Sequence, residues 1–119
     1  MKTMKVKELL DELNLTLLTK DVSEDALYAE VKGGYASDLL SNAMGQAQPG
    51  MVWVTMQGHQ NVAAVASLIG LACVIVAGEG PVAEETLHKA NANDIVVAST
   101  KEPAFELIGK MYELGIGKN

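Results

Sequence analysis

A long stretch without charged side chains occupies the middle of this 119-residue chain. No Asp, Glu, Lys or Arg occurs between Asp38 and Glu79. Because burying an unpaired charge costs far more free energy than burying an apolar group, this stretch is expected to lie in the interior. The apolar runs Met51–Met56 and Cys73–Ala77 are typical of buried parallel strands, and Val62–Ile69 between them is typical of a helix that is covered on several sides. The stretch therefore predicts a strand–helix–strand unit.

The flanking segments extend this alternation. Before residue 51 we expect a first helix with the apolar face Val6, Leu9, Leu10 and Leu13. Two short strands should follow, Leu15–Thr19 and Leu27–Val31, with the polar loop Lys20–Asp25 between them. A second helix should be capped by Ser37, with Asp38 in its first turn and the buried stripe Leu39, Leu40, Ala43, Met44 and Ala47. After residue 78 we expect a helix with Ala83, Leu87 and Ala90 inside, a strand at Ile95–Ala98, and a last helix opened by a Ser99–Glu102 capping box, with the apolar face Phe105, Ile108, Met111 and Tyr112. This order predicts an α/β fold, a single small domain over residues 1–119 with a mostly parallel sheet and helices on its faces.

Charge and cysteine content exclude several classes of protein. The net charge of −6 disfavours a nucleic-acid partner, which needs a clustered basic surface. The apolar run Val62–Gly78 is too short and too interrupted by Gly70 to span a membrane. Cys73 is the only cysteine, so no disulfide forms within the chain. We expect its side chain to be a small buried hydrophobic group. Because the first residues also lack an apolar signal-peptide core, we expect a cytoplasmic location.

The motifs of catalysis and metal binding are missing from the sequence. It contains no GxxxxGK[ST] phosphate loop, no GxGxxG turn and no nucleophile elbow. His59 and His88 do not stand at metal-ligand spacing from each other or from Cys73. We therefore predict no catalytic residues and no metal site, although the sequence leaves a dispersed Ser-His-Asp arrangement open.

Polar segments follow three of the expected strands. In open α/β sheets, ligands bind beyond the carboxyl ends of the strands, where helix N-termini present free N–H groups to anions. The candidate ligand-binding residues are Thr55, Gln57, Gly58, His59, Gln60 and Asn61, then Gly78, Glu79 and Gly80, then Ser99 and Thr100, followed by Lys101.

Each part of this candidate site has an expected role. We expect the glycines to leave room for a ligand against the backbone. We expect Glu79 to face hydroxyls, an amine or solvent, because it would repel an anion. His59 is the expected ligand-contacting side chain, and its removal should leave the stability of the free protein almost unchanged. The alternative is that each segment is only a turn followed by a helix cap.

Several segments together resemble the DRTGG domain. These are Glu30–Ser41, which includes Gly33-Gly34, then Trp53–Asn61, then the strand end Ile75–Gly78. Only Gly33 and Gly34 match the name-giving motif, and Glu30, Val31 and Lys32 stand where Asp, Arg and Thr would be. The resemblance covers nearly the whole chain. It implies a small α/β module similar to the N-terminal domain of HPr kinase/phosphorylase, a regulatory or dimerisation domain without the kinase's own phosphate loop.

Three functional hypotheses follow from the sequence. The first is a non-catalytic regulatory module that binds a small anionic or nucleotide-like ligand as a homodimer, with no ATP-dependent kinase activity. The second is an interaction subunit that docks on a metabolic or redox enzyme without a small ligand. The third is a small enzyme that uses the region around His59. Self-association is expected through an apolar face, because Val62–Ile69 is apolar nearly all round. The sequence does not indicate a cofactor.

Overall fold

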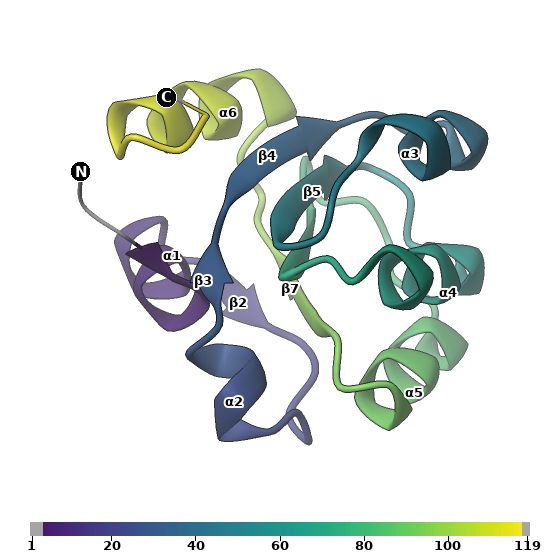
Figure 1. Ribbon diagram of the computed structural model, residues 1–119. Coiled ribbons are helices and arrows are strands. Elements are labelled where there is room, and N and C mark those ends of the chain that lie inside the picture. The colour runs from purple at the N-terminus through teal and green to yellow at the C-terminus, as the bar shows by residue number, and fades with distance from the viewer. Residues whose placement is uncertain (1–3, 118–119) are drawn as a thin grey trace.

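A five-stranded, mostly parallel sheet forms the centre of the molecule (Figure 1). The computed structural model describes residues 4–117. Four strands lie side by side and parallel in chain order: β4 (Gly33–Ala36), β5 (Met51–Thr55), β6 (Cys73–Val76) and β7 (Val96–Ser99). A fifth strand, β2 (Thr16–Leu17), pairs antiparallel with β7 at the other edge. The α/β fold with a mostly parallel sheet is thus confirmed.

Helices cover both faces of this sheet (Figure 1). The three helices between the parallel strands, α3 (Leu40–Gln46), α4 (Gln60–Ile69) and α5 (Glu84–Ala92), all lie on one face. The other face is covered by α1 (Val6–Glu12) and α6 (Ala104–Glu113), which come from before and after the parallel strands. The sheet is therefore the middle of three layers.

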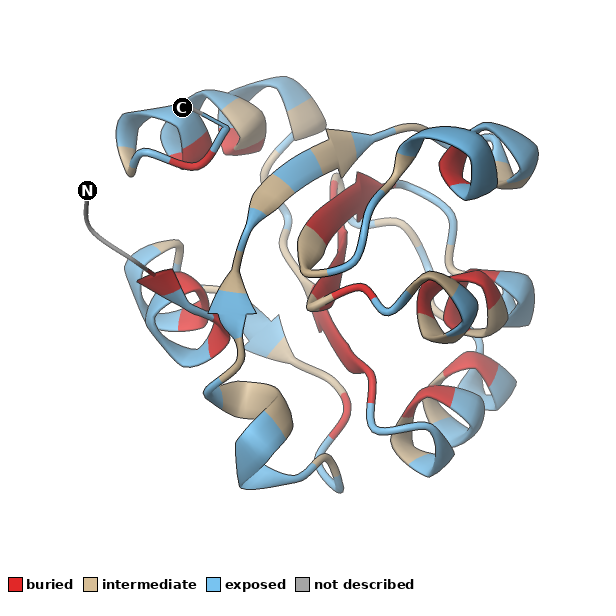
Figure 2. Ribbon diagram, in the orientation of Figure 1, coloured by how far each residue is buried: buried red, intermediate tan, exposed pale blue. Residues whose placement is uncertain are grey.

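Side chains of each central strand alternate between two cores. Trp53, Val74 and Val97 pack toward α3, α4 and α5, whereas Val54 and Ile75 pack toward α1 and α6. All five are at most 3% exposed, and Figure 2 shows burial concentrated in the sheet and the inward sides of the helices. This two-sided burial explains why the strand sequences are continuous apolar runs.

Helix α4 owes its apolar circumference to its neighbours in the fold. It lies between α3 and α5 on the sheet, and four of its residues are buried: Val62, Ala63, Val65 and Ala66. Leu68 is 72% exposed. Contacts within one chain thus account for most of the pattern from which the sequence predicted self-association. In the part of the chain that the structure describes, no helix is both long and apolar enough to cross a membrane.

The segment before β4 differs from its sequence-based prediction. Glu24–Leu27 forms a short helix, α2, which takes in the end of the predicted loop and the start of the predicted strand. Only Glu30–Val31 is extended there, as β3, and it pairs antiparallel with β1 (Met4–Lys5). Ser23 caps α2, and its hydroxyl and amide also donate to the carboxylate of Asp94, which lowers the pKa of that carboxyl. This local cap and its tertiary anchor favour a helical turn where the sequence predicted a loop and the start of a strand.

Two predicted helix starts and two apolar faces are also corrected. Helix α3 begins after Leu39 rather than Ser37, and α6 begins after Pro103, while Ser99 remains in β7 and makes no capping box. In α3, Leu39 and Met44 are exposed, and in α6 the 86% exposed Phe105 lies outside the core. The predicted Met111 is buried, and together with Leu107, which was not predicted, it holds α6 to the sheet.

We predict a pH dependence of stability from the buried thiol of Cys73. Burial raises its pKa from 9.0 to about 12, so the folded state keeps the proton over a range in which the unfolded chain loses it. The contribution is full below pH 9.0 and is lost as the pH rises toward 12. Urea unfolding should show the free energy of unfolding of the wild type falling by up to ~1.4 kcal/mol per pH unit more than that of Cys73→Ala. Equal slopes for the two proteins would contradict it.

Candidate functional site

The ends of β5, β6 and β7 lie next to one another at one edge of the sheet. Thr55 is in register with Val76, and Val76 is in register with Ser99. The three polar segments therefore begin at neighbouring strand ends. What they contact at that edge decides which of them is free to bind a ligand.

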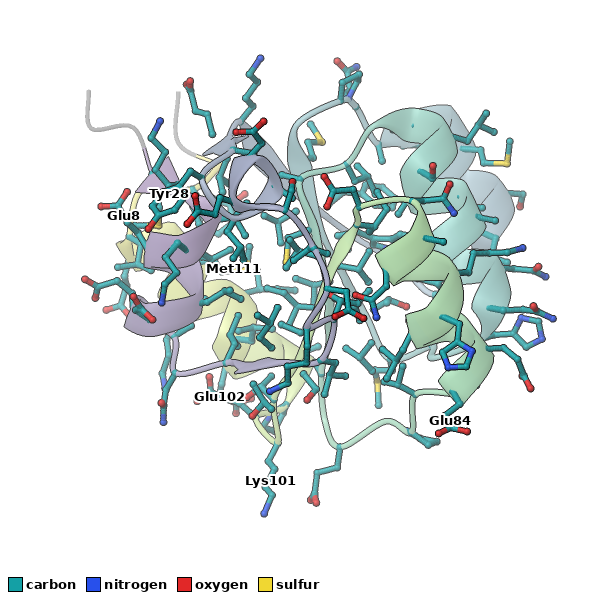
Figure 3. All side chains as sticks on the ribbon, turned by 90° about the horizontal axis from the view of Figure 1, so that it is seen from below. Glu8, Tyr28, Glu84, Lys101, Glu102 and Met111 are labelled. Carbon is teal, nitrogen blue, oxygen red and sulfur yellow. The ribbon has the colours of Figure 1, made fainter. Side chains whose placement is uncertain are left out.

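The second and third segments are hydrogen-bonded to each other's backbone. The N–H of Gly78 donates to Glu102 O at 2.9 Å, and the N–H of Glu79 donates to Thr100 O at 3.2 Å. The N–H of Thr100 in turn donates to Val76 O at 3.1 Å. These N–H groups are thus occupied within the fold and do not present the free anion site that the sequence suggested. Lys101 points away from the molecule (Figure 3).

Gly58 and Gly80 serve close approach between two loops. A Cβ on Gly58 would lie 1.9 Å from Pro81 O, and one on Gly80 would lie 2.6 Å from Met56 O. The carbonyl of Gly58 accepts a 2.6 Å hydrogen bond from the hydroxyl of Thr86, a buried residue of α5. The space beside these glycines is therefore filled by neighbouring backbone, contrary to the expectation that it accommodates a ligand.

Asp38 is a central residue of this edge that sequence reasoning assigned to a helix turn. It lies between β4 and α3, and its Oδ1 accepts from Thr55 Oγ1 at 2.7 Å and from the Met56 N–H at 2.8 Å. Thr55 is 2% exposed, and its Oγ1 also accepts from the Gln57 N–H at 3.1 Å. This carboxylate thus fixes the turn that leaves β5. The position of Asp38 just after a strand could have indicated this role. That strand, β4, was not predicted from the sequence, because it begins with two glycines.

His59 is the N-cap of α4. Its Nδ1 accepts from the Asn61 N–H at 3.2 Å, so in the neutral ring the proton is on Nε2, which is a donor. Gln60 is the first residue of the helix and is exposed. The imidazole therefore combines a structural role at one nitrogen with a second nitrogen that remains available.

Two hollows meet at Asp38. One, of about 260 Å³, is lined by Asp38, Leu40, Gln57, His59, Asn61 and Val62. The other, of about 300 Å³, is lined by Ala36, Ser37, Asp38, Val54, Thr55, Met56 and Ala104. Of the residues predicted from sequence, the structure places Gln57, His59, Asn61 and Thr55 at these hollows, whereas Gly78, Glu79, Gly80, Ser99 and Thr100 line neither of them.

The first hollow combines one carboxylate with amides and an imidazole. Such a set accepts hydrogen bonds at Asp38 and both donates and accepts at Gln57 and Asn61. It suits a ligand that carries hydroxyl or amino groups better than a bare anion. Among residues 4–117, no cluster of three or more His, Cys, Asp or Glu side chains could hold a metal ion.

Comparisons with known proteins support the fold. No family model matches the chain, and no curated protein matches it. Among solved structures, the CBS and DRTGG domains of the regulatory region of Clostridium perfringens pyrophosphatase, complexed with the activator diadenosine tetraphosphate, match with a TM-score of 0.71 and 16% identity. The match covers 88% of this chain and 44% of that one, so the chain spans less than half the length of this neighbour. At this identity the similarity shows the fold, in agreement with the fold that the DRTGG resemblance implies.

We predict that Gly58→Ala destabilises the protein by ~1–3 kcal/mol or more, because the added methyl group would overlap backbone atoms. Urea unfolding measures the loss. The matched control is Gly45→Ala in α3, where a Cβ meets nothing within 4 Å. That change should be neutral or stabilise by ~0.5–1 kcal/mol. Similar stabilities for the two variants would show that the loops do not approach each other as described.

We predict that two substitutions of His59 differ in their effect on the free energy of unfolding. Removal of the cap in His59→Ala should cost ~0.5–2 kcal/mol, whereas His59→Asn should cost little, because Asn is among the best N-cap residues. This revises the sequence-based expectation that His59→Ala leaves stability unchanged. Thermal and urea unfolding of both variants measure the difference. A destabilised His59→Asn beside an unaffected His59→Ala would contradict the capping role.

Proposed function

We propose that this chain is a non-catalytic regulatory module that senses a nucleotide-like ligand and acts as a homodimer. The observation that carries the proposal is the convergence of Asp38, Gln57, His59 and Asn61 around one hollow at the carboxyl ends of the parallel strands. This edge is where open α/β sheets bind ligands. The proposal narrows the sequence-based expectation from a small anionic or nucleotide-like ligand to a nucleotide-like ligand that offers hydroxyl or amino groups.

Each side chain of the hollow has a role in this proposal. Asp38 Oδ1 is already bound to Thr55 and Met56, and its other carboxylate oxygen is the acceptor for ribose hydroxyls or an amino group. Nε2 of His59 donates to the ligand while Nδ1 caps α4. The exposed amides of Gln57 and Asn61 read the polar edge of a base or sugar.

The solved neighbour supports the choice of ligands to test first. Its regulatory region is complexed with an activator that is an adenine dinucleotide. The similarity covers 44% of a chain that holds two kinds of domain, so the activator is not assigned to the matched part. Adenine nucleotides therefore enter as probes, and the side chains around the hollow carry the argument.

The second candidate is an interaction subunit that docks on a metabolic or redox enzyme. The observation that favours it is the exposure of large apolar side chains, above all Phe105 at 86%, Leu68 at 72% and Leu39 at 67%. The two candidates differ in one readout. A ligand-sensing module gains stability from a small molecule alone, and an interaction subunit does not.

We predict that a panel of adenosine, AMP, ATP and diadenosine tetraphosphate contains a compound that raises the melting temperature, whereas inorganic phosphate alone does not. A ligand that binds only the folded state adds RT ln(1 + [L]/Kd) to the free energy of unfolding, which a thermal-shift measurement detects. Labelled phosphate from ATP should not be transferred to HPr protein. No shift with any nucleotide, together with capture of a single enzyme partner, would favour the second candidate.

Two conservative variants locate the site. In Asp38→Asn, the amide oxygen still accepts from Thr55 and Met56, so the turn is kept while the charge is lost. In His59→Asn, the cap is kept while the imidazole is lost. Both should weaken binding by ~0.5–3 kcal/mol, the range for one lost hydrogen bond to a neutral or a charged group, with little change in the free protein. A shift that survives both changes places the ligand elsewhere.

A further inference from the structure

Helix α6 is apolar on two sides. Leu107 and Met111 face the sheet and are buried, whereas Phe105 is 86% and Tyr112 is 50% exposed. We call Phe105, Ile108, Gly109 and Tyr112 the α6 stripe, because their spacing places them on one side of the helix. A Cβ on Gly109 would meet nothing within 4 Å. The stripe is thus an uncharged surface with two aromatic rings at its ends and a flat position in its middle.

A hollow lies directly beside the stripe. It has a volume of about 150 Å³ between α6 and β4, and its walls include Gly34, Ala36, Val54, Ile108, Met111 and Tyr112. Among the described residues, β4 has no strand on its outer side, so the hollow opens at a free edge of the sheet. An apolar cavity of about 150 Å³ is large enough for a benzene ring. The same face of the molecule therefore carries an exposed ring and a space that fits one.

We propose that two copies of the chain form a two-fold dimer in which the α6 helices cross antiparallel and Phe105 of each copy enters the hollow of the other. A two-fold interface needs a patch that is complementary to itself, and the stripe with its hollow meets this condition. The register that places Phe105 opposite Tyr112 of the second copy also places Ile108 opposite Gly109. The side chain of Ile108 then meets the position that has none, which lets the two helices approach closely.

Charges frame the stripe without entering it. Glu102 and Lys110 form a 2.6 Å ion pair within the chain. Because each copy carries a net charge of −6, long-range repulsion opposes association, and added salt should strengthen the dimer. This salt response separates an apolar interface from one that ion pairs hold together.

The inference rests on the homodimer of the proposed function and is tested without ligand, so its failure would remove the homodimer but leave ligand sensing to be tested separately by thermal shift. The experiment is sedimentation equilibrium of the purified wild type and three variants, from low to high micromolar protein. The wild type should form a reversible dimer. Phe105→Ala should raise the dimer dissociation constant by roughly tenfold or more, because buried aromatic anchors dominate interfaces.

Two further variants make the outcome specific to α6. Gly109→Gln places a long side chain where the helices meet, and it should abolish the dimer while the monomer keeps or gains stability, because Gln is the better helix former. The control, Leu68→Ala, removes a side chain on α4 that is 72% exposed and should leave the dimer unchanged. Thermal melts confirm that each variant is folded.

Three results would overturn the proposal. One is a wild type that stays monomeric at high micromolar concentration, which would make the stripe a surface for a different protein. Another is a dimer that tolerates both Phe105→Ala and Gly109→Gln. The last is a dimer that only Leu68→Ala disrupts, because the interface would then lie on α4.

Discussion

Burial of the central parallel strands on both faces is the constraint on which the rest of the molecule depends. The order β4, β5, β6, β7 runs one way across the sheet, and the helices that connect these strands all lie on the same face. Nothing within that run can cover the second face, so α1 and α6 must come from either side of it in the chain. Helix α6 then lies beside the free edge of β4, with one side turned to the sheet and another to solvent. The hollow at that edge and the exposed aromatic stripe both follow from this placement.

The sequence predicted well those elements whose pattern is set by burial alone. The charge-free stretch from Asp38 to Glu79 gave β5, α4 and β6 nearly at their observed bounds, because both neighbouring layers require apolar residues. It missed β4, because Gly33 and Gly34 have little strand preference and become extended only through pairing with β5. It also placed Phe105 inside and left out Leu107, because a helix that is apolar on two sides offers no periodic reason to prefer one over the other.

The candidate site was predictable in location but only partly in composition. That polar segments end neighbouring parallel strands was evident from the order of elements, and Gln57, His59 and Asn61 do surround one hollow. Asp38 was missed because it follows the strand that was missed. The glycines were misread because contact between two loop backbones depends on tertiary structure and leaves no local trace. The strand order also contains no reversal within β4 to β7, so the hollow is formed by the starts of α3 and α4 rather than by a crevice between oppositely directed loops.

The pairing of β2 with β7 has a consequence for how the chain reaches this structure. Each parallel strand pairs with the next one along the chain, so β4 to β7 and their helices can assemble stepwise from nearby segments. Thr16, in contrast, must pair with Ser99, which lies 83 residues later in the chain. Closing so long a loop is entropically costly, and such contacts slow folding. We therefore expect the segment that holds α1 and β2 to dock last, which leaves the part of the sheet that α1 covers exposed until then and makes it the surface most open to aggregation during folding.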